Sequence, residues 1–297
     1  MTPYYESGGI TIYHGDCREI LPTLPVNSVR LVWTDPPYGL SFNDGGDLAH
    51  RREHALGQRS PGPCDARPIA GDKPEDYETL ITGVLPELAR ICCNDCCCCC
   101  CCGGGGPRPM FAEMALWMDR RPWQFFHAVV WRKAGLGMGW RYRRDYEFVM
   151  VSHKASGNLA WYYDGHDISN VIDGRRILPQ AHEHPTPKPV ELIQHFVMLH
   201  SQPGDIVLDP FMGHGPSLVA AKLSGRRAIG IELDESYCEA AALRLSQGTL
   251  DLCGPVAATD TDMRVASIGL LGSTVDRVAG FDGGNQGRLF GDDATYE

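Results

Sequence analysis

The sequence predicts an α/β fold built on a largely parallel, doubly wound β-sheet. Short apolar or alternating runs of strand length alternate along the chain with longer segments that have helical periodicity. Turn signals separate the two kinds of segment. The 297 residues, of which 43% are hydrophobic, are also sufficient to bury a large core. In such a sheet, ligands bind at the carboxyl ends of the strands.

Seven apolar or alternating runs with turn residues at their ends are expected to be strands: 10–14, 29–34, 96–102, 125–131, 147–152, 206–209 and 228–232. Four segments with apolar residues at helical spacing are expected to be helices: 74–91, 190–199, 216–223 and 235–245. Two segments, 41–72 and 155–183, show neither period. We expect them to be insertions or loops, where binding residues often lie.

Residues 1–248 are expected to form one domain and residues 249–297 a flexible tail. The tail is rich in Gly, Asp, Thr and Ala, and it holds eight acidic residues against three arginines. The chain has no run of eighteen apolar residues, and its first residues lack the basic and apolar regions of a signal peptide. These features predict a cytoplasmic protein that does not enter a membrane.

The distribution of charge is uneven. A formal net charge of −10 argues at first against a nucleic-acid partner. Residues 120–144, however, contain seven basic and no acidic residues, with Trp123, Trp131, Trp140 and Tyr142 between them. This stretch is either a solvated face or a contact surface for DNA.

Nine of the thirteen cysteines lie between Cys92 and Cys102, seven of them consecutively. Consecutive residues of a strand point to opposite faces, so the run cannot direct four thiolates at one tetrahedral zinc ion. Cysteine is small and readily buried, so we expect a central strand in a reducing compartment and no metal site.

The first motif that carries chemistry is a glycine-rich turn. Asp209 ends an apolar strand, Gly213 and Gly215 follow, and after a helix a second strand ends in Glu232. The glycines let the backbone approach a ligand, and Glu232 can accept hydrogen bonds from ribose hydroxyls. This spacing suits NAD or S-adenosylmethionine, or a tight turn that binds nothing.

The second motif is Asp35-Pro36-Pro37-Tyr38, at the end of the apolar run 29–34. Asp35 can accept one N–H of an exocyclic amine, a carbonyl of the Pro-Pro step can accept the other, and Tyr38 can stack on a base. The prolines stiffen the turn and remove competing amides. Holding the amine in line with the methyl group of a sulfonium supplies much of the catalysis of methyl transfer.

Together these residues resemble the DNA amino-methyltransferases of the permuted group, in which the catalytic motif precedes the cofactor motif; the resemblance covers residues 9–248. It implies a circularly permuted, Rossmann-like S-adenosylmethionine-dependent methyltransferase fold with a seven-stranded, mostly parallel sheet and one antiparallel strand. Residues 10–14 would be its third strand, displaced by the permutation, and 125–152 would supply its antiparallel pair.

The resemblance also implies roles for single residues. Asp35, Pro36, Pro37 and Tyr38 would be catalytic, and the cofactor would contact Asp209, Phe211, Gly213, Gly215, Ser217 and Glu232. Thr186 and Lys188, in His184-Pro185-Thr186-Pro187-Lys188-Pro189, would hold its amino-acid end, and Asp16 would recognise its adenine. The family usually has Gly-Ser-Gly-Thr-Thr in the cofactor loop, whereas this chain has Pro216 and Ser217 in the last two positions. Pro216 suits a first helical position but removes an N–H from the cofactor site.

Methylation of a base in double-stranded DNA requires that the target nucleotide flips out of the stack. Arg132, Lys133, Arg141, Arg143 and Arg144 are the expected DNA contacts. Segments 41–72 and 155–183 are candidate recognition insertions, and their shortness predicts a recognition site of a few base pairs. In the tail, Gln286-Gly287-Arg288-Leu289-Phe290 resembles the Gln-x-x-Leu-Phe peptide that docks on the replication sliding clamp; the alternative is an unstructured end.

Other functions remain open at this point. Adenine N6 is the favoured target, and cytosine N4 is the alternative because one pocket serves any exocyclic amine. A nicotinamide-dependent oxidoreductase would explain the glycine-rich turn and Glu232 but leaves the Asp35 motif unexplained. A DNA-binding regulator on an inactive scaffold is a third possibility. A monomer and a homodimer are equally compatible with the sequence.

Overall fold

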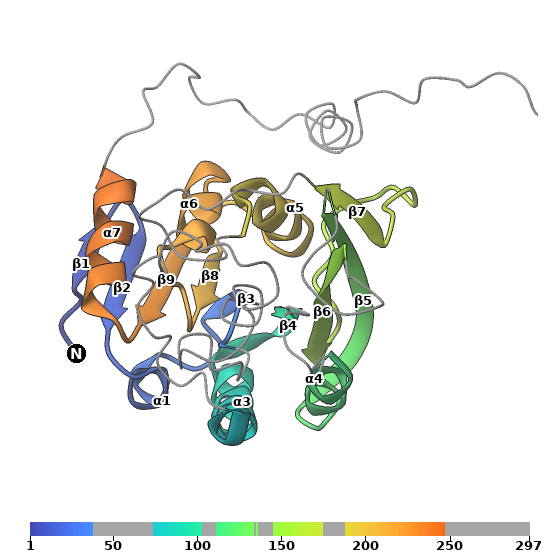
Figure 1. Cartoon of the computed structure of the whole chain (residues 1–297), viewed down its shortest axis with the longest axis horizontal. Coiled ribbons are helices and arrows are strands. Elements are labelled where there is room, and N and C mark those ends of the chain that lie inside the picture. Colours follow the sequence, from blue (N-terminus) through green and yellow to red (C-terminus); the bar gives the residue numbers. More distant parts are fainter. Residues whose placement is uncertain (38–73, 103–110, 134, 136–144, 175–187, 247–297) are drawn as a thin grey trace, which may run out of the picture.

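The computed structural model describes residues 1–37, 74–102, 111–133, 135, 145–174 and 188–246. These residues form one nine-stranded sheet, in the order β1-β2-β9-β8-β3-β4-β6-β5-β7, with helices on both faces (Figure 1). The strands are β1 (Tyr5–Ser7), β2 (Ile10–His14), β3 (Val29–Thr34), β4 (Cys92–Cys102), β5 (Trp123–Lys133), β6 (Tyr146–Lys154), β7 (Val171–Gly174), β8 (Ile206–Asp209) and β9 (Arg227–Glu232). The helices are α1 (Cys17–Ile20), η1 (Leu21–Thr23), α3 (Pro74–Ile91), α4 (Phe111–Met118), α5 (Val190–His200), α6 (Pro216–Leu223) and α7 (Glu235–Ser246).

The sheet is mostly parallel. Strands β2, β9, β8, β3 and β4 lie in this order in the sheet and pair in parallel with one another. Strand β6 runs antiparallel to both β4 and β5, whereas β7 is parallel to β5 and β1 is antiparallel to β2. The predicted α/β class is therefore confirmed. The seven predicted strands are all present, and the short strands β1 and β7 extend the sheet at its two edges.

Two hydrophobic cores lie on opposite faces of the sheet. Figure 1 shows α5, α6 and α7 on one face and α1, α3 and α4 on the other. Successive residues of β3 alternate between them: Trp33 packs in the core with α5, where its ring lies 5.2 Å from that of Phe196, and Val32 packs in the core with α3. Helices on both faces make the sheet doubly wound, as the sequence predicts.

The cysteine-rich strand β4 is central, between β3 and β6. This confirms the prediction of a buried strand, although β4 begins at Cys92 rather than Cys96 and crosses the polar Asn94 and Asp95. Cys92 and Cys96 are joined in a disulfide, whereas residues 97–101 are buried thiols. Among the described helices, none combines the length and the hydropathy that a membrane span requires.

Candidate functional site

The carboxyl ends of four neighbouring strands bring the two sequence motifs together. Strands β2, β9, β8 and β3 lie side by side and run in the same direction, with Val32 of β3 opposite Leu208 of β8. Asp35 follows β3, and the glycine-rich segment 211–215 follows β8. Parallel strands end at one edge of the sheet, so the two motifs are adjacent in space. This edge is where open α/β sheets bind their ligands.

Asp35 forms an ion pair with Lys188, which lies immediately before α5 and its N-cap Pro189. The Lys188 Nζ donates a hydrogen bond to Asp35 Oδ2 at 2.6 Å, and the lysine side chain is only 4% exposed. Burial acts to lower the pKa of Lys188, but the carboxylates of Asp35 and Glu147 outweigh it and raise that pKa above the ordinary value. Lys188 was expected to hold the cofactor, and its ammonium group contacts the Asp35 motif.

Glu147, in β6, continues this chain of charges. Its Oε2 lies 3.6 Å from Lys188 Nζ, and its Oε1 accepts a hydrogen bond from Lys133 at the end of β5. Burial acts to raise the pKa of Glu147, but the two lysines lower it below the ordinary value. Glu147 belongs to no sequence motif and was not predicted. Lys133, expected to contact DNA, has its ammonium group paired with this buried carboxylate.

Asp209, the last residue of β8, is buried and stabilises the glycine-rich turn through hydrogen bonds. It is 3% exposed, and it accepts hydrogen bonds from the Ser217 hydroxyl and, at 3.1 Å, from the Phe211 amide. Burial, helped by the negative charges of Asp35 and Glu232, raises the pKa of Asp209 to about 7 against the effect of these hydrogen bonds. Asp209 and Ser217, both expected to contact a cofactor, contact each other, because a buried carboxyl group needs donors.

Two glycines with positive φ angles shape the turn from β8 to α6. Gly213 and Gly215 have φ angles of 52° and 69°, which glycine adopts without strain. Gly215 caps α6 and Pro216 is its first residue, where a missing N–H removes no helical hydrogen bond. Glu232 accepts hydrogen bonds from the amides of Gly213 at 3.0 Å and Asp234 at 2.9 Å, which fixes its carboxylate beside the turn.

Asp16 lies at the same edge, after β2. His14 of this strand is opposite Glu232 of β9, and the Gly15 amide donates to the Glu232 carbonyl at 2.9 Å. Asp16 accepts a hydrogen bond from the Arg18 amide and forms an ion pair with the Arg18 side chain at 2.5 Å. The hydrogen bond from this side chain lowers the pKa of Asp16. Two acidic side chains at adjacent strand ends suit a ligand with several hydroxyl or amino groups.

The predicted DNA contacts are only partly within the described residues. Arg132, at the end of β5, is exposed and forms an ion pair with Asp173 of β7 at 2.5 Å. Several predictions lie outside the described part of the chain: Tyr38, Thr186, Arg141, Arg143, Arg144, segment 41–72 and the tail with Gln286–Phe290. Segment 155–183 is described up to Gly174 and contributes β7 to the sheet, so it is not wholly a loop.

Three known proteins are similar to this chain in sequence or in fold. The M2.DpnII type II methyltransferase of Streptococcus pneumoniae is 24% identical over 262 residues, which cover 82% of this chain and 92% of that protein. The M1.HpyAVI–SAM complex superposes with a TM-score of 0.58 at 22% identity, over 80% of this chain and 98% of that one. The cytosine-N4-specific PvuII DNA methyltransferase gives a TM-score of 0.61 at 16% identity, over 91% and 96%. These structural likenesses show a shared fold.

A family model decides the assignment. The model of the DNA methylases, N6_N4_Mtase, matches residues 29–243. The match includes the Asp35 motif, Lys188, the glycine-rich turn and Glu232. The chain therefore belongs to the N6_N4_Mtase family of DNA methylases.

Proposed function

We propose that this chain transfers a methyl group from S-adenosylmethionine to the exocyclic amino group of a flipped-out DNA base, with adenine N6 as the favoured target. One observation carries the proposal: the Asp35 motif follows β3 directly beside the glycine-rich turn that follows β8. Methyl transfer between two bound ligands requires a group that binds the target amine and a nucleotide-binding turn at the same edge of the sheet.

The Asp35 motif binds the target amine. The Asp35 carboxylate accepts one N–H and the backbone carbonyl of the Pro-Pro step accepts the other, while Tyr38 stacks on the base. Methyl transfer places positive charge on the amine nitrogen, which the carboxylate stabilises. The ion pair with Lys188 holds this carboxylate in one orientation. Tyr38 is assigned from the sequence motif alone.

The residues around the turn fit S-adenosylmethionine, which supplies an electrophilic methyl group when bound. Glu232 is held by two backbone amides and can accept from the ribose hydroxyls, while Asp16 at the next strand end can accept from the adenine amino group. Gly213 and Gly215 let the ligand approach the backbone. Thr186 is assigned to its amino-acid end, and Lys188 would contact that end only in addition to its bond with Asp35.

Adenine N6 is favoured over cytosine N4 because Asp35, rather than Ser, opens the motif; Ser is more typical of cytosine enzymes. The fold itself does not discriminate, since the cytosine-N4-specific PvuII enzyme shares it. We also assign the chain to the permuted group, because the Asp35 motif precedes the glycine-rich turn in the sequence. A regulator on an inactive scaffold is the remaining alternative.

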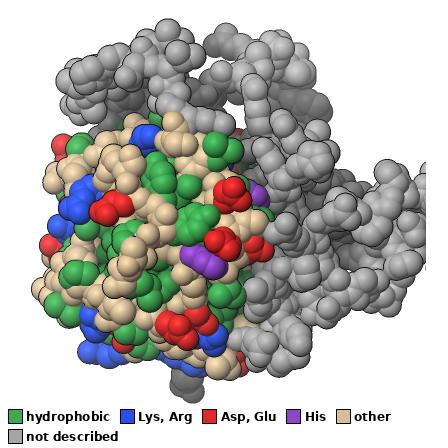
Figure 2. Space-filling view, turned by 90° about the vertical axis from the view of Figure 1, so that its left-hand side faces the viewer, with side chains coloured by type: hydrophobic (Ala, Val, Ile, Leu, Met, Phe, Trp, Pro, Cys, Tyr) green, Lys and Arg blue, Asp and Glu red, His purple; other side chains and the backbone are tan. Residues whose placement is uncertain are grey.

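Double-stranded DNA would contact Arg132 and, later in the sequence, the basic residues Arg141, Arg143 and Arg144. The opposite side of the molecule is a poor candidate. Figure 2 shows the side formed by β1, β2 and α7, where the described Lys and Arg side chains form small separate groups among acidic and hydrophobic ones. Neutralising the three arginines 141, 143 and 144 should weaken binding about equally on all sequences and reduce its salt dependence. An unchanged salt slope would refute this contact surface.

The tail would contact the replication sliding clamp through Gln286–Phe290. Deleting residues 280–297 should abolish co-elution of the chain with the clamp. If the full-length chain does not co-elute, the clamp is not a partner.

The decisive experiment incubates the purified chain with DNA and labelled S-adenosylmethionine, digests the DNA and identifies the methylated nucleoside by mass spectrometry. Asp35→Ala should abolish the product. Asp119→Ala is the control, because Asp119 is exposed and precedes β5 at the opposite edge of the sheet. N6-methyladenine supports the proposal, and N4-methylcytosine redirects it to the other base. No product on any DNA favours the regulator.

A further inference from the structure

The cysteines of β4 are divided between the two cores. Cys97, Cys99 and Cys101 pack in the core with α5, whereas Cys96, Cys98 and Cys100 pack in the core with α3 and α4. The expectation of no metal site rested on this alternation, which prevents four consecutive thiols from converging. It does not prevent two alternate thiols from meeting a ligand that another element supplies.

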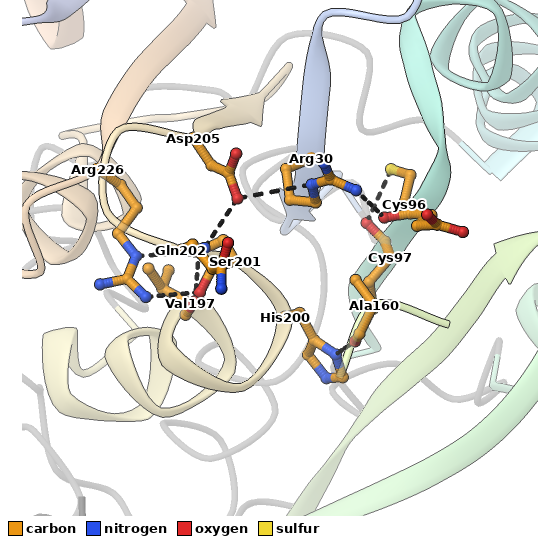
Figure 3. A network of polar contacts seen from close by, with 11 residues as sticks. Arg30, Cys96, Cys97, Ala160, Val197, His200, Ser201, Gln202, Asp205 and Arg226 are labelled. Atoms are coloured by element: carbon orange, nitrogen blue, oxygen red, sulfur yellow. Dashed lines mark hydrogen bonds and ion pairs between the residues drawn. The ribbon is translucent and has the colours of Figure 1, made fainter. Parts of the chain in front are cut away.

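His200, the last residue of α5, is that ligand. It is 2% exposed, and its Nδ1 lies 2.7 Å from the Ala160 carbonyl (Figure 3). A carbonyl oxygen only accepts, so Nδ1 carries a proton and Nε2 holds the lone pair of the neutral ring. Metal-bound histidines have this arrangement, in which the second nitrogen donates to a carbonyl. The rings of Trp161 and Phe196, with centroids 5.5 Å and 6.3 Å away, complete an apolar surrounding.

The three side chains converge. The Sγ atoms of Cys97 and Cys99 are 3.4 Å apart, and one ring nitrogen of His200 lies with them so that all three ligand atoms are within 4.8 Å of one another. All three residues are buried. We propose that Cys97, Cys99 and His200 form a binding site for one soft metal ion, Cu(I). This inference is independent of the methyl-transfer activity.

The ligand set favours Cu(I) over other biological cations. Two thiolates and an imidazole are soft to borderline ligands, which disfavours Mg²⁺ and Ca²⁺. Structural Zn²⁺ takes four ligands, and within the described residues the cluster offers three Cys, His or carboxylate groups. Cu(I) is stable with two thiolates and one imidazole. Binding forms the three metal–ligand bonds and releases two thiol protons to solvent, with no change of oxidation state.

The bound ion would link β4 to the C-terminal end of α5, and Cys99 lies opposite Trp33, two residues before Asp35. Loading should accordingly stabilise the fold around the site.

The test measures Cu(I) affinity of the full-length chain anaerobically, by competition with a chromogenic Cu(I) chelator. We expect one tight ion per chain. Cys97→Ala with Cys99→Ala should weaken binding more than about 100-fold, since even outer partners of metal ligands contribute about 10–100-fold. Cys98→Ala with Cys100→Ala is the matched control, because it removes two thiols from the opposite face of the same strand and should leave the affinity unchanged.

A third variant addresses the histidine. His200→Asn keeps an N–H donor for the Ala160 carbonyl but removes Nε2. It should weaken binding about tenfold or more, and X-ray absorption should change from mixed sulfur and nitrogen to sulfur-only coordination. It also replaces the cysteine double variant if that variant does not fold. Equal losses in the two double variants, absence of a tight ion in the wild type, or sulfur-only coordination in the wild type would each overturn the proposal.

Discussion

Replacing Glu147 by glutamine should destabilise the fold, because it removes one of two carboxylates that compensate a buried ammonium. The substitution keeps the size of the side chain and an oxygen that can accept from Lys133. It removes the negative charge that lies 3.6 Å from Lys188 Nζ. In this variant, Lys188 retains its ion pair with Asp35.

The expected size follows from burial. The side chains of Glu147 and Lys188 are 12% and 4% exposed, so solvent screens their interaction poorly. Removing one partner of a buried ion pair costs about 3–5 kcal/mol when the other is left uncompensated. Lys188 retains Asp35, and Lys133, 27% exposed, can turn toward water. We therefore expect the free energy of unfolding to fall by about 2–3 kcal/mol, at or below the lower end of that range.

The effect should depend on pH in a defined direction. The folded-state pKa of Glu147 is lowered, so its stabilisation is present above the unfolded pKa of about 4.3 and is lost as the pH falls through the folded pKa. Urea denaturation at pH 7 and at a series of acidic pH values measures the difference between wild type and Glu147→Gln. Glu191→Gln, at an exposed position of α5, is the control. A loss equal to that of the control, or one that is unchanged below pH 4, would refute the reasoning.

Three further substitutions test other parts of the site. Asp209→Asn should flatten the pH dependence of stability. The Asp209 carboxyl group has a pKa of about 7 in the folded state, so it stabilises the fold below its unfolded pKa of about 3.9, and this contribution is lost as the pH rises through 7. An unchanged pH dependence in urea denaturation would contradict this prediction. Gly215→Ala should lower the free energy of unfolding by about 1–2 kcal/mol because of its left-handed backbone, and by a further amount because the new Cβ would lie 3.1 Å from the Cβ of Ala241. Calorimetry should show a smaller loss for Gly8→Ala, because Gly8 has a positive φ but no such contact. Lys188→Met should lower kcat by up to about 100-fold through misplacement of its carboxylate partner; a higher KM for S-adenosylmethionine at unchanged kcat would instead indicate that the lysine binds the cofactor.

Most of the fold could be predicted from local patterns. The bounds of β3 and α3 coincide with the predicted ones, because β3 is a short, mostly apolar run and α3 has a sustained helical period. Strands β1 and β7 have three and four residues, too few for any period to be recognised. Helix α4 was missed although it carries a signal: Met114, Trp117 and Met118 are buried at spacings of three and four. The irregular sequence around it obscured that pattern.

The site was predictable where its residues are contiguous in sequence. The Asp35 motif and the glycine-rich turn are each encoded in a few residues, so their placement at strand ends followed directly. Glu147 belongs to no motif. Its signal was an acidic residue in the otherwise mostly apolar strand Tyr146–Lys154, where a carboxylate needs a partner that only the tertiary structure identifies. The same limit explains why the ion pair between Lys133 and Glu147 was not predicted.

The four charges near the Asp35 motif alternate in sign. Lys133, Glu147, Lys188 and Asp35 form a series of contacts that sums to zero charge. In the proposed reaction, Lys188 alone would offset the negative potential that Asp35 presents to an amine acquiring positive charge. Because Glu147 compensates its charge, the Lys188 ammonium can orient Asp35 without adding net positive charge near the amine. Removing Glu147 should therefore slow methyl transfer as well as destabilise the fold. The net charge near the amine rises by one, whereas negative charge stabilises the positive charge that develops in the transition state.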